Sequence, residues 1–211
     1  RLSPAEVPDQ AVRACRVLHV GSLSLTDEPA RSATLHAVEL ARQAGALISF
    51  DPNYRASLWP TEHEAIEQME TLLYRADLVK INEDEAVLLC GTNDAHKAAR
   101  RILDCGAALV AVTLGSQGAL IATRAENVFV PTFPCQPRDA TGAGDSFWGA
   151  LLYRLVHEQE VGTADDLAAL SCEELFSAGS FACAAASCCV ERPGAIPAMP
   201  GKREVFDRLA Q

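Results

Sequence analysis

Short apolar runs alternate with helix-like segments through the first half of the chain. The runs are rich in aliphatic side chains and cover residues 16–20, 46–50, 77–81 and 108–113. Between them, apolar side chains recur at helical spacing over residues 27–45, 61–75, 83–90 and 94–105. Strands that are apolar on both faces, each followed by a helix, indicate a parallel sheet that helices cover on both sides.

The second half of the chain predicts two further strands and more helix. Residues 119–123 and 127–130 have strand character, and a helix is expected to begin near Gly142. Residues 165–190, rich in Ala and Cys, predict one or two helices that are buried all round, and residues 204–210 predict a terminal helix. Because no linker interrupts this pattern, we expect a single α/β domain over residues 1–211.

Charge and cysteine content exclude several classes of protein. The 211 residues carry 18 basic and 28 acidic side chains, a net charge of −10, which argues against nucleic-acid binding. No apolar stretch reaches the length of about 18 residues that a membrane span needs. The eight cysteines have irregular spacing and no Cys-x-x-Cys pair, which disfavours a zinc site. Reduced, packed thiols favour a cytoplasmic protein.

Polar residues follow several of the predicted strands at the point where each strand ends. They are Gly21 and Ser22, Asp51 and Asn53, Asn82, and Thr113 and Gly115. Because the carboxyl ends of parallel strands lie at one edge of a sheet, and ligands bind there, we expect these residues to share one rim.

The sharpest motif is Asp139-Ala-Thr-Gly-Ala-Gly-Asp145, at the start of a predicted helix. Gly142 and Gly144 let backbone N–H groups approach a ligand closely, and a helix N-terminus favours an anion such as a phosphate. Asp145 in the first helical turn could accept a proton from an attacking hydroxyl. The alternative is a glycine-rich turn whose Asp145 only interacts with the helix dipole.

This motif resembles the C-terminal signature of the ribokinase (PfkB) carbohydrate kinase family. Four other segments resemble family motifs and occur in the family's order along nearly the whole chain. They are Asp51-Pro-Asn-Tyr-Arg55 with Leu58-Trp59, Asn82-Glu-Asp-Glu85, Thr113-Leu-Gly-Ser-Gln-Gly118 and Arg192-Pro-Gly-Ala195.

The resemblance implies a ribokinase-like three-layer α/β/α fold with a mostly parallel central sheet. It makes Asp145 the general base that deprotonates the sugar hydroxyl. It also implies that Gly142, Ala143 and Gly144 form the anion hole for the γ-phosphoryl group of ATP.

Two other motifs are implied to handle the nucleotide. Asn82 and Glu85 would organise the phosphates and Mg²⁺, largely through water, although an Asn followed by Glu three residues later is also a capping box. Thr113, Gly115 and Gly118 would admit nucleotide phosphate, although a plain turn between two strands explains them as well.

Asp51, Asn53 and Arg55 are the candidate substrate residues. Arg55 could bind phosphate or substrate with its planar donor fork, and the alternative is an Asx turn followed by a surface arginine. Asp139 and Thr141 match the family's monovalent-cation site, with K⁺ as the candidate ion. The resemblance completes that site with the backbone carbonyls of Cys189, Arg192 and Gly194. Ala198 stands where some members carry a hydroxyl, which leaves dependence on K⁺ open.

The resemblance therefore predicts an ATP- and Mg²⁺-dependent sugar kinase, fructokinase-like, with a small sugar as substrate and a homodimer as the candidate assembly. Two alternatives stay open: a kinase of 2-keto-3-deoxygluconate or another acidic sugar, bound through Arg55, and a non-catalytic nucleotide-binding fragment. The family also has an N-terminal sugar-binding segment and a β lid. Neither precedes Arg1, so we expect this chain to be the C-terminal part of a longer kinase.

Overall fold

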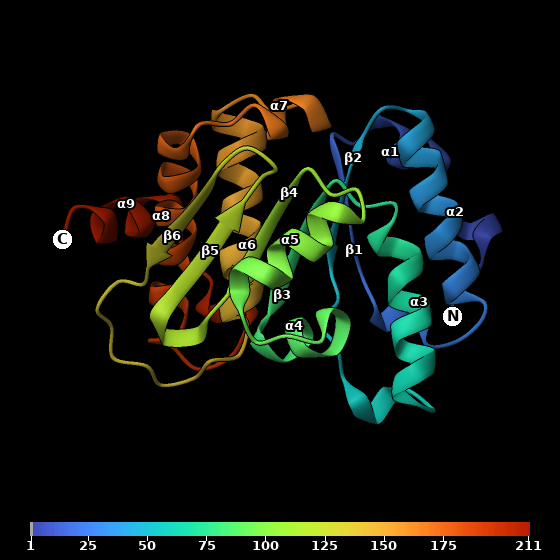
Figure 1. The fold of residues 1–211 in the computed structure, drawn as a ribbon, viewed down its shortest axis with the longest axis horizontal. Coiled ribbons are helices and arrows are strands. Elements are labelled where there is room, and N and C mark those ends of the chain that lie inside the picture. The colour runs from blue at the N-terminus through green and yellow to red at the C-terminus, as the bar shows by residue number, and fades with distance from the viewer. Residues whose placement is uncertain (1) are drawn as a thin grey trace. The chain divides into compact units, whose positions relative to one another are not determined.

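The structure is a computed structural model that describes residues 2–211 (Figure 1). The chain divides into two compact units. The first comprises Arg1–Val112 and Gly162–Ala169, and the second comprises Thr113–Val161 and Leu170–Gln211. That these units form a single domain, as the sequence predicts, stays a prediction.

Strands form the centre of the first unit. They are β1 (Val17–Gly21), β2 (Leu47–Asp51), β3 (Leu78–Asn82) and β4 (Leu109–Thr113), whose last residue belongs to the second unit. β1 pairs in parallel with β2, Val17 lying opposite Leu47, and β2 pairs in parallel with β3, Phe50 lying opposite Val79. All of β2 is buried, as expected for a strand inside a parallel sheet. The predicted α/β class with a mostly parallel sheet is confirmed.

Most helices of this unit lie between its strands along the chain. They are α2 (Ala30–Gln43), α3 (Glu62–Leu73), α4 (Glu83–Cys90) and α5 (Ala95–Asp104), whereas α1 (Asp9–Ala14) precedes β1 and the short α7 (Ala164–Ala168) follows β4. Local signals set several boundaries: Thr61 Oγ1 accepts a hydrogen bond from the amide of Glu64 at 3.1 Å and caps α3. α4 ends at Gly91, which has a left-handed conformation.

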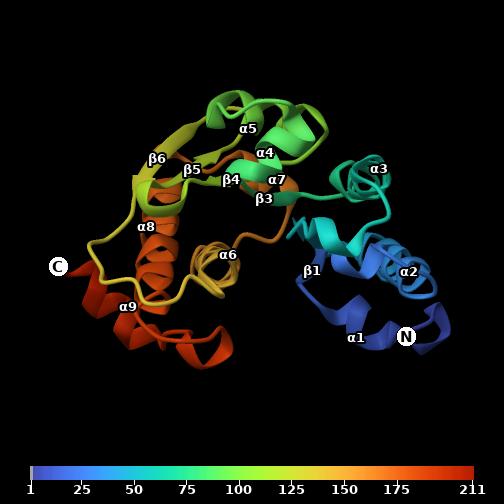
Figure 2. The same ribbon diagram turned by 90° about the horizontal axis from the view of Figure 1, so that it is seen from below.

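The second unit combines a strand pair with long helices. β5 (Gly118–Ala122) and β6 (Asn127–Pro131) are antiparallel, and the helices are α6 (Ala143–Tyr153), α8 (Cys172–Cys189) and α9 (Lys202–Leu209). One π-helical turn, Arg154–Glu158, extends α6. Figure 2 shows α6, α8 and α9 on the same side of β5 and β6. Most residues of α8 are buried, as the Ala- and Cys-rich sequence predicts.

The contact between α8 and the strand pair depends on a missing side chain. A Cβ atom on Gly179 would lie 2.5 Å from Ile121 Cδ1 and 2.7 Å from Val130 Cγ2, closer than carbon atoms can approach. Glycine therefore lets the helix backbone pack directly on β5 and β6.

The sequence argues against a membrane span and against a zinc site, and residues 2–211 can be compared with both expectations. No helix there is long and apolar enough to cross a membrane. The same residues contain no group of three or more His, Cys, Asp or Glu side chains arranged to hold a metal ion. All eight cysteines are free thiols.

Candidate functional site

The N-terminus of α6 presents backbone amides that have no acceptor among residues 2–211. Gly142 is the N-cap, and it accepts a hydrogen bond from Ser146 N at 2.8 Å, while Ala143 N donates to Ala140 O at 3.2 Å. In the described part of the chain, the amides of Gly144 and Asp145 have no partner. These two N–H groups can therefore bind an anion at the positive end of the helix dipole.

Asp145 lies in the first turn of α6 with an exposed side chain. It lines a cavity of about 270 Å³ whose other walls include Tyr153, Phe181 and Met199. Lys202 closes one side, with its Nζ 2.9 Å from the hydroxyl of Tyr153. The Asp145 carboxylate therefore lies in the same helical turn as the amides of Gly144 and Asp145. The cavity beside it has space for a small molecule.

Cys189 is buried directly behind this helix terminus. Its Sγ lies 3.9 Å from the carbonyl oxygen of Thr141. Burial raises the pKa of this thiol, and the charges of Asp139 and Asp145 raise it further against an opposing hydrogen bond with Ser146. The thiol therefore adds no negative charge beside the helix terminus at neutral pH.

Asp139 connects the two C-terminal motifs. Its Oδ1 accepts the amide of Thr141 at 2.9 Å, and its Oδ2 accepts the amide of Gly194 at 2.8 Å. The hydrogen bond from the Thr141 hydroxyl, followed by these two amide bonds, lowers the pKa of Asp139 to about 2. Both carboxylate oxygens thus already accept backbone amides, and a monovalent-cation site at Asp139 and Thr141 stays a prediction.

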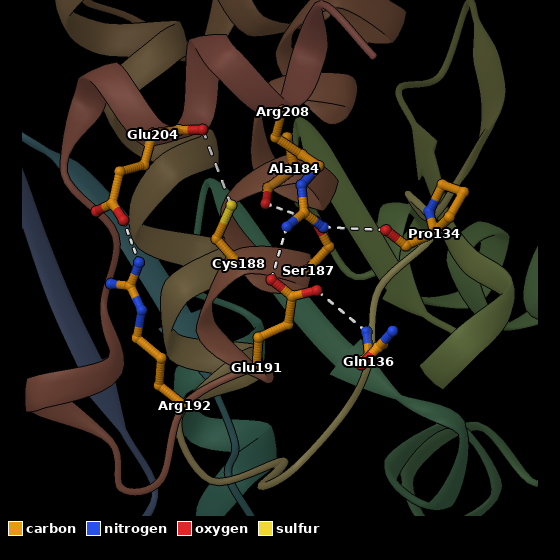
Figure 3. Close-up of polar contacts among 9 residues, drawn as sticks. All are labelled: Pro134, Gln136, Ala184, Ser187, Cys188, Glu191, Arg192, Glu204 and Arg208. Atoms are coloured by element: carbon orange, nitrogen blue, oxygen red, sulfur yellow. Dashed lines mark hydrogen bonds and ion pairs between the residues drawn. The ribbon is translucent and has the colours of Figure 1, made fainter.

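Arg208 of α9 joins the segments on either side of that site (Figure 3). Its guanidinium donates to Pro134 O at 3.0 Å and forms an ion pair with Glu191 at 2.7 Å. Glu191 also accepts the amide of Gln136 at 3.1 Å, and the two contacts lower the pKa of Glu191. α9 therefore holds together the loop before Asp139 and the end of α8.

The segment between β4 and β5 is a short 3₁₀ turn, Gly115–Gln117. Leu114 N donates to Gly118 O at 2.8 Å, so the turn closes on itself. Gly118 is buried opposite Pro131, and strand pairing alone explains its place. Gly115 is exposed and available to a ligand. The roles of Thr113, Gly115 and Gly118 toward a nucleotide stay predictions.

In the first unit, Asn82 and Glu85 form the capping box that the sequence allowed. Asn82 Oδ1 accepts the amide of Glu85, and Glu85 Oε2 accepts the amide of Asn82, each at 2.9 Å. Glu85 is 2% exposed, and its Oε1 accepts the amide of Tyr54 at 2.9 Å. Burial raises the pKa of Glu85, Asp51 adds to the shift, and the hydrogen bonds and Lys80 oppose it.

This geometry bears on how the pair could hold Mg²⁺. Both carboxylate oxygens of Glu85 are already bonded to backbone amides, and the side-chain oxygen of Asn82 caps α4. The donor set therefore fits a hydrated ion, contacted through water, rather than direct coordination.

The Asx turn expected after β2 is also present. Asp51 Oδ1 accepts the amide of Asn53 at 3.2 Å, and Asn53 has a positive φ of 45°. Asp51 is 4% exposed and its other oxygen, Oδ2, lies 2.7 Å from Lys80 Nζ. Arg55 is exposed and donates to Tyr54 O at 3.1 Å. Of the candidate substrate residues, Asp51 is thus committed to internal bonds, whereas Arg55 faces solvent.

The predicted rim is confirmed for β1, β2 and β3. Ser22 N, just after β1, donates to Pro52 O at 3.1 Å, and Tyr54 N reaches Glu85 as described above. The carboxyl ends of β1, β2 and β3 therefore lie at one edge of the sheet. Lys80 belongs to this cluster, and sequence reasoning missed it; the available signal was a charged residue inside an apolar strand.

Open amides and a carboxylate in one helical turn of an α/β chain form an arrangement that can bind a phosphate group. Residues 2–202 match a family model described as pfkB family carbohydrate kinase. The chain therefore belongs to the pfkB family of carbohydrate kinases.

Individual relatives agree with this assignment. Fructokinase-2 of Solanum habrochaites is 37% identical over 209 residues, which cover 99% of this chain and 62% of the relative. The crystal structure of fructokinase with bound ATP from Xylella fastidiosa has a TM-score of 0.89 and 30% identity, covering 99% of this chain and 66% of the other. Fructokinase from Vibrio cholerae O395, in its fructose-, ADP- and calcium-bound form, has a TM-score of 0.83 and 31% identity, covering 99% and 64%. The chain thus spans about 62% of the length of the plant fructokinase.

Proposed function

We propose that this protein is an ATP-dependent sugar kinase that transfers the γ-phosphoryl group to a sugar hydroxyl, with fructose as the first candidate. The observation that carries the proposal is the first turn of α6. There, the unpartnered amides of Gly144 and Asp145 stand beside the exposed carboxylate of Asp145.

In this proposal the amides bind and orient the γ-phosphoryl group and stabilise the charge that develops on it. The Asp145 carboxylate accepts the proton of the attacking sugar hydroxyl, which then attacks phosphorus in line with the leaving ADP. Mg²⁺, when bound, neutralises phosphate charge. Asn82 and Glu85 would hold it through water, and Asp139 with Thr141 would hold K⁺ near the α6 terminus.

Fructose is favoured because the relatives named above are fructokinases, and one of them was crystallised with fructose and ADP. A second candidate is an acidic sugar such as 2-keto-3-deoxygluconate. The observation in its favour is Arg55, whose exposed guanidinium donates to Tyr54 O and, among the described residues, keeps its other donors for a carboxylate. The third candidate is a non-catalytic nucleotide-binding fragment, which is consistent with coverage of 62% of the plant relative.

The proposal extends to the cellular setting. Eight free thiols suit a reducing compartment, so we place the enzyme in the cytoplasm. A homodimer is the proposed assembly, and sedimentation equilibrium would measure it.

Turnover of ATP with fructose, other ketoses, aldoses and 2-keto-3-deoxygluconate tests the function. We expect phosphorylation that falls by about 10²- to 10⁴-fold in Asp145→Asn, the usual contribution of a general base, with binding of ATP retained. Asp207→Asn, an exposed aspartate of α9, is the matched control and should keep full activity. Equal turnover in Asp145→Asn would refute the mechanism. Calorimetric binding of ATP without any turnover would favour the nucleotide-binding fragment.

A further inference from the structure

Lys80 is a buried cation in the middle of an apolar strand. It lies in β3 between Val79 and Ile81, which are fully buried, and is itself 6% exposed. Its Nζ lies 2.7 Å from Asp51 Oδ2, one residue beyond the pairing of β2 with β3 at Phe50 and Val79. Removing two charges from water is costly, and apolar residues of similar volume often stabilise a core equally well. Packing alone therefore does not account for this ion pair.

The ion pair sets the orientation of the Asp51 carboxylate. With Oδ2 held by Lys80, Oδ1 accepts the amide of Asn53 at 3.2 Å. Asn53 is fixed in a left-handed conformation with φ of 45°, which a side-chain hydrogen bond of this kind supports. Lys80 thus determines the turn that follows β2.

The same turn is joined to the start of α4. The next amide, that of Tyr54, donates to Glu85 Oε1, and Glu85 Oε2 accepts the amide of Asn82. Two buried carboxylates, Asp51 and Glu85, repel each other here, and Lys80 attracts both. Lys80 is therefore the shared counter-charge of the two segments that carry Arg55 and Asn82.

We infer that Lys80 is a positioning residue for the phosphoryl transfer proposed above, on which this inference rests. Through Asp51 it fixes the turn that presents Arg55, and through Glu85 it fixes the capping box at Asn82. It needs no contact with substrate, because its effect passes through backbone amides of the turn.

The test compares Lys80→Met with the double variant Lys80→Met/Asp51→Asn in the 211-residue chain. The double variant removes both charges, so no unpaired charge stays buried, and its stability to urea should return close to that of the wild type. In both variants we expect the turn at Asn53 and Tyr54 to lose the conformation that the ion pair between Lys80 and Asp51 fixes. We expect the amides of Asn53 and Tyr54 in the ligand-free protein to exchange with solvent at least tenfold faster, measured by NMR.

In sugar phosphorylation, the double variant should show a kcat/KM at least tenfold below wild type despite its recovered stability. A purely structural ion pair predicts the opposite, because activity would recover together with stability. Wild-type exchange at Asn53 and Tyr54, or wild-type kcat/KM, in the double variant would overturn the inference.

Asp77→Asn is the matched control. Asp77 precedes β3 and its carboxylate accepts the amide of Ile48 at 2.7 Å, so it joins the same two strands away from the turn. This variant should lose stability without selective exchange at Asn53 and Tyr54. A wild-type chain without kinase activity would refute the proposed function, whereas the exchange measurement still decides whether Lys80 holds the turn.

Discussion

Gly142 lies against the backbone of Ala195. This contact joins the motif that ends at Asp145 to the motif that begins at Arg192. A Cβ atom on Gly142 would lie 3.0 Å from both Cα and Cβ of Ala195. Gly142 also has a φ of 80°, in the left-handed region that favours glycine. The start of α6 is therefore fixed by a close backbone contact that admits no side chain.

Gly142→Ala should damage both stability and anion binding. The left-handed conformation alone costs about 1–2 kcal/mol for an L-residue, and the contact with Ala195 adds strain that displaces the helix start. We expect a lower free energy of unfolding in urea and at least tenfold weaker ATP binding by calorimetry.

Gly149→Ala is the control on the same helix. A Cβ there meets no atom within 4 Å, so alanine should stabilise α6 by about 0.5–1 kcal/mol without changing ATP binding. Equal behaviour of the two variants would contradict the role given to the Ala195 contact.

Asp139 should make stability depend on acid pH in a defined window. Its folded pKa of about 2 lies below the ordinary 3.8, so the charged form stabilises the folded state. That stabilisation is fully present above about pH 4 and is lost as pH falls toward 2. Asp139→Asn should therefore lower Tm at pH 6, and its difference from wild type should shrink between pH 4 and 2.

Thermal unfolding at a series of pH values measures this difference. Asp207→Asn changes an exposed aspartate of α9 whose side chain makes no hydrogen bond with residues 2–211; it is the control and should keep the wild-type profile. A constant difference between Asp139→Asn and wild type across the acid range would show that the Asp139 carboxylate does not cause it.

Gly179→Ala sets two effects of opposite sign against each other. Alanine favours a helix interior by about 1 kcal/mol over glycine. The added Cβ would, however, lie 2.5 Å from Ile121 Cδ1, and overpacking of a core costs about 1–3 kcal/mol. We expect net destabilisation in urea unfolding. The double variant Gly179→Ala/Ile121→Val, which removes the clashing methyl, should recover part of the loss; no recovery would contradict the clash.

Much of this fold could be predicted because its signals are local. α4 begins at Glu83 and ends at Cys90 as expected, since the cap Asn82 and the terminator Gly91 adjoin it in sequence. α1 was not predicted, because its short segment buries a single apolar side chain, Val12. The break between α7 and α8 was left open, although Ser171 with Glu174 is a capping box.

The candidate site shows where sequence reasoning ends. The motif around Asp139 identified the open helix terminus, since glycine next to a first-turn carboxylate is a local pattern. The partner of Asp51 is 29 residues away, and their pairing depends on the register of β2 against β3. No local pattern reports such a contact, so Asp51 was assigned to substrate while its ion pair with Lys80 went unrecognised.

Cys172 offers a last prediction, about thiol reactivity. It is the exposed cysteine among the eight, and its Sγ donates a hydrogen bond to Glu126 Oε2 at 2.9 Å. This bond, followed by burial and the negative charge of Glu126, raises the pKa of the thiol. Because the thiolate is the reactive form, Glu126→Gln should lower the pKa of Cys172 and increase its labelling rate at pH 8.

Labelling with a chromogenic disulfide and mass spectrometry of the peptides would follow each thiol. Glu173→Gln changes a neighbouring exposed glutamate and should leave the rate at Cys172 unchanged. Cys183, whose pKa burial raises to about 12, should react only after unfolding and so marks the intact protein. An unchanged rate at Cys172 in Glu126→Gln would mean that access, rather than the carboxylate, limits its reaction.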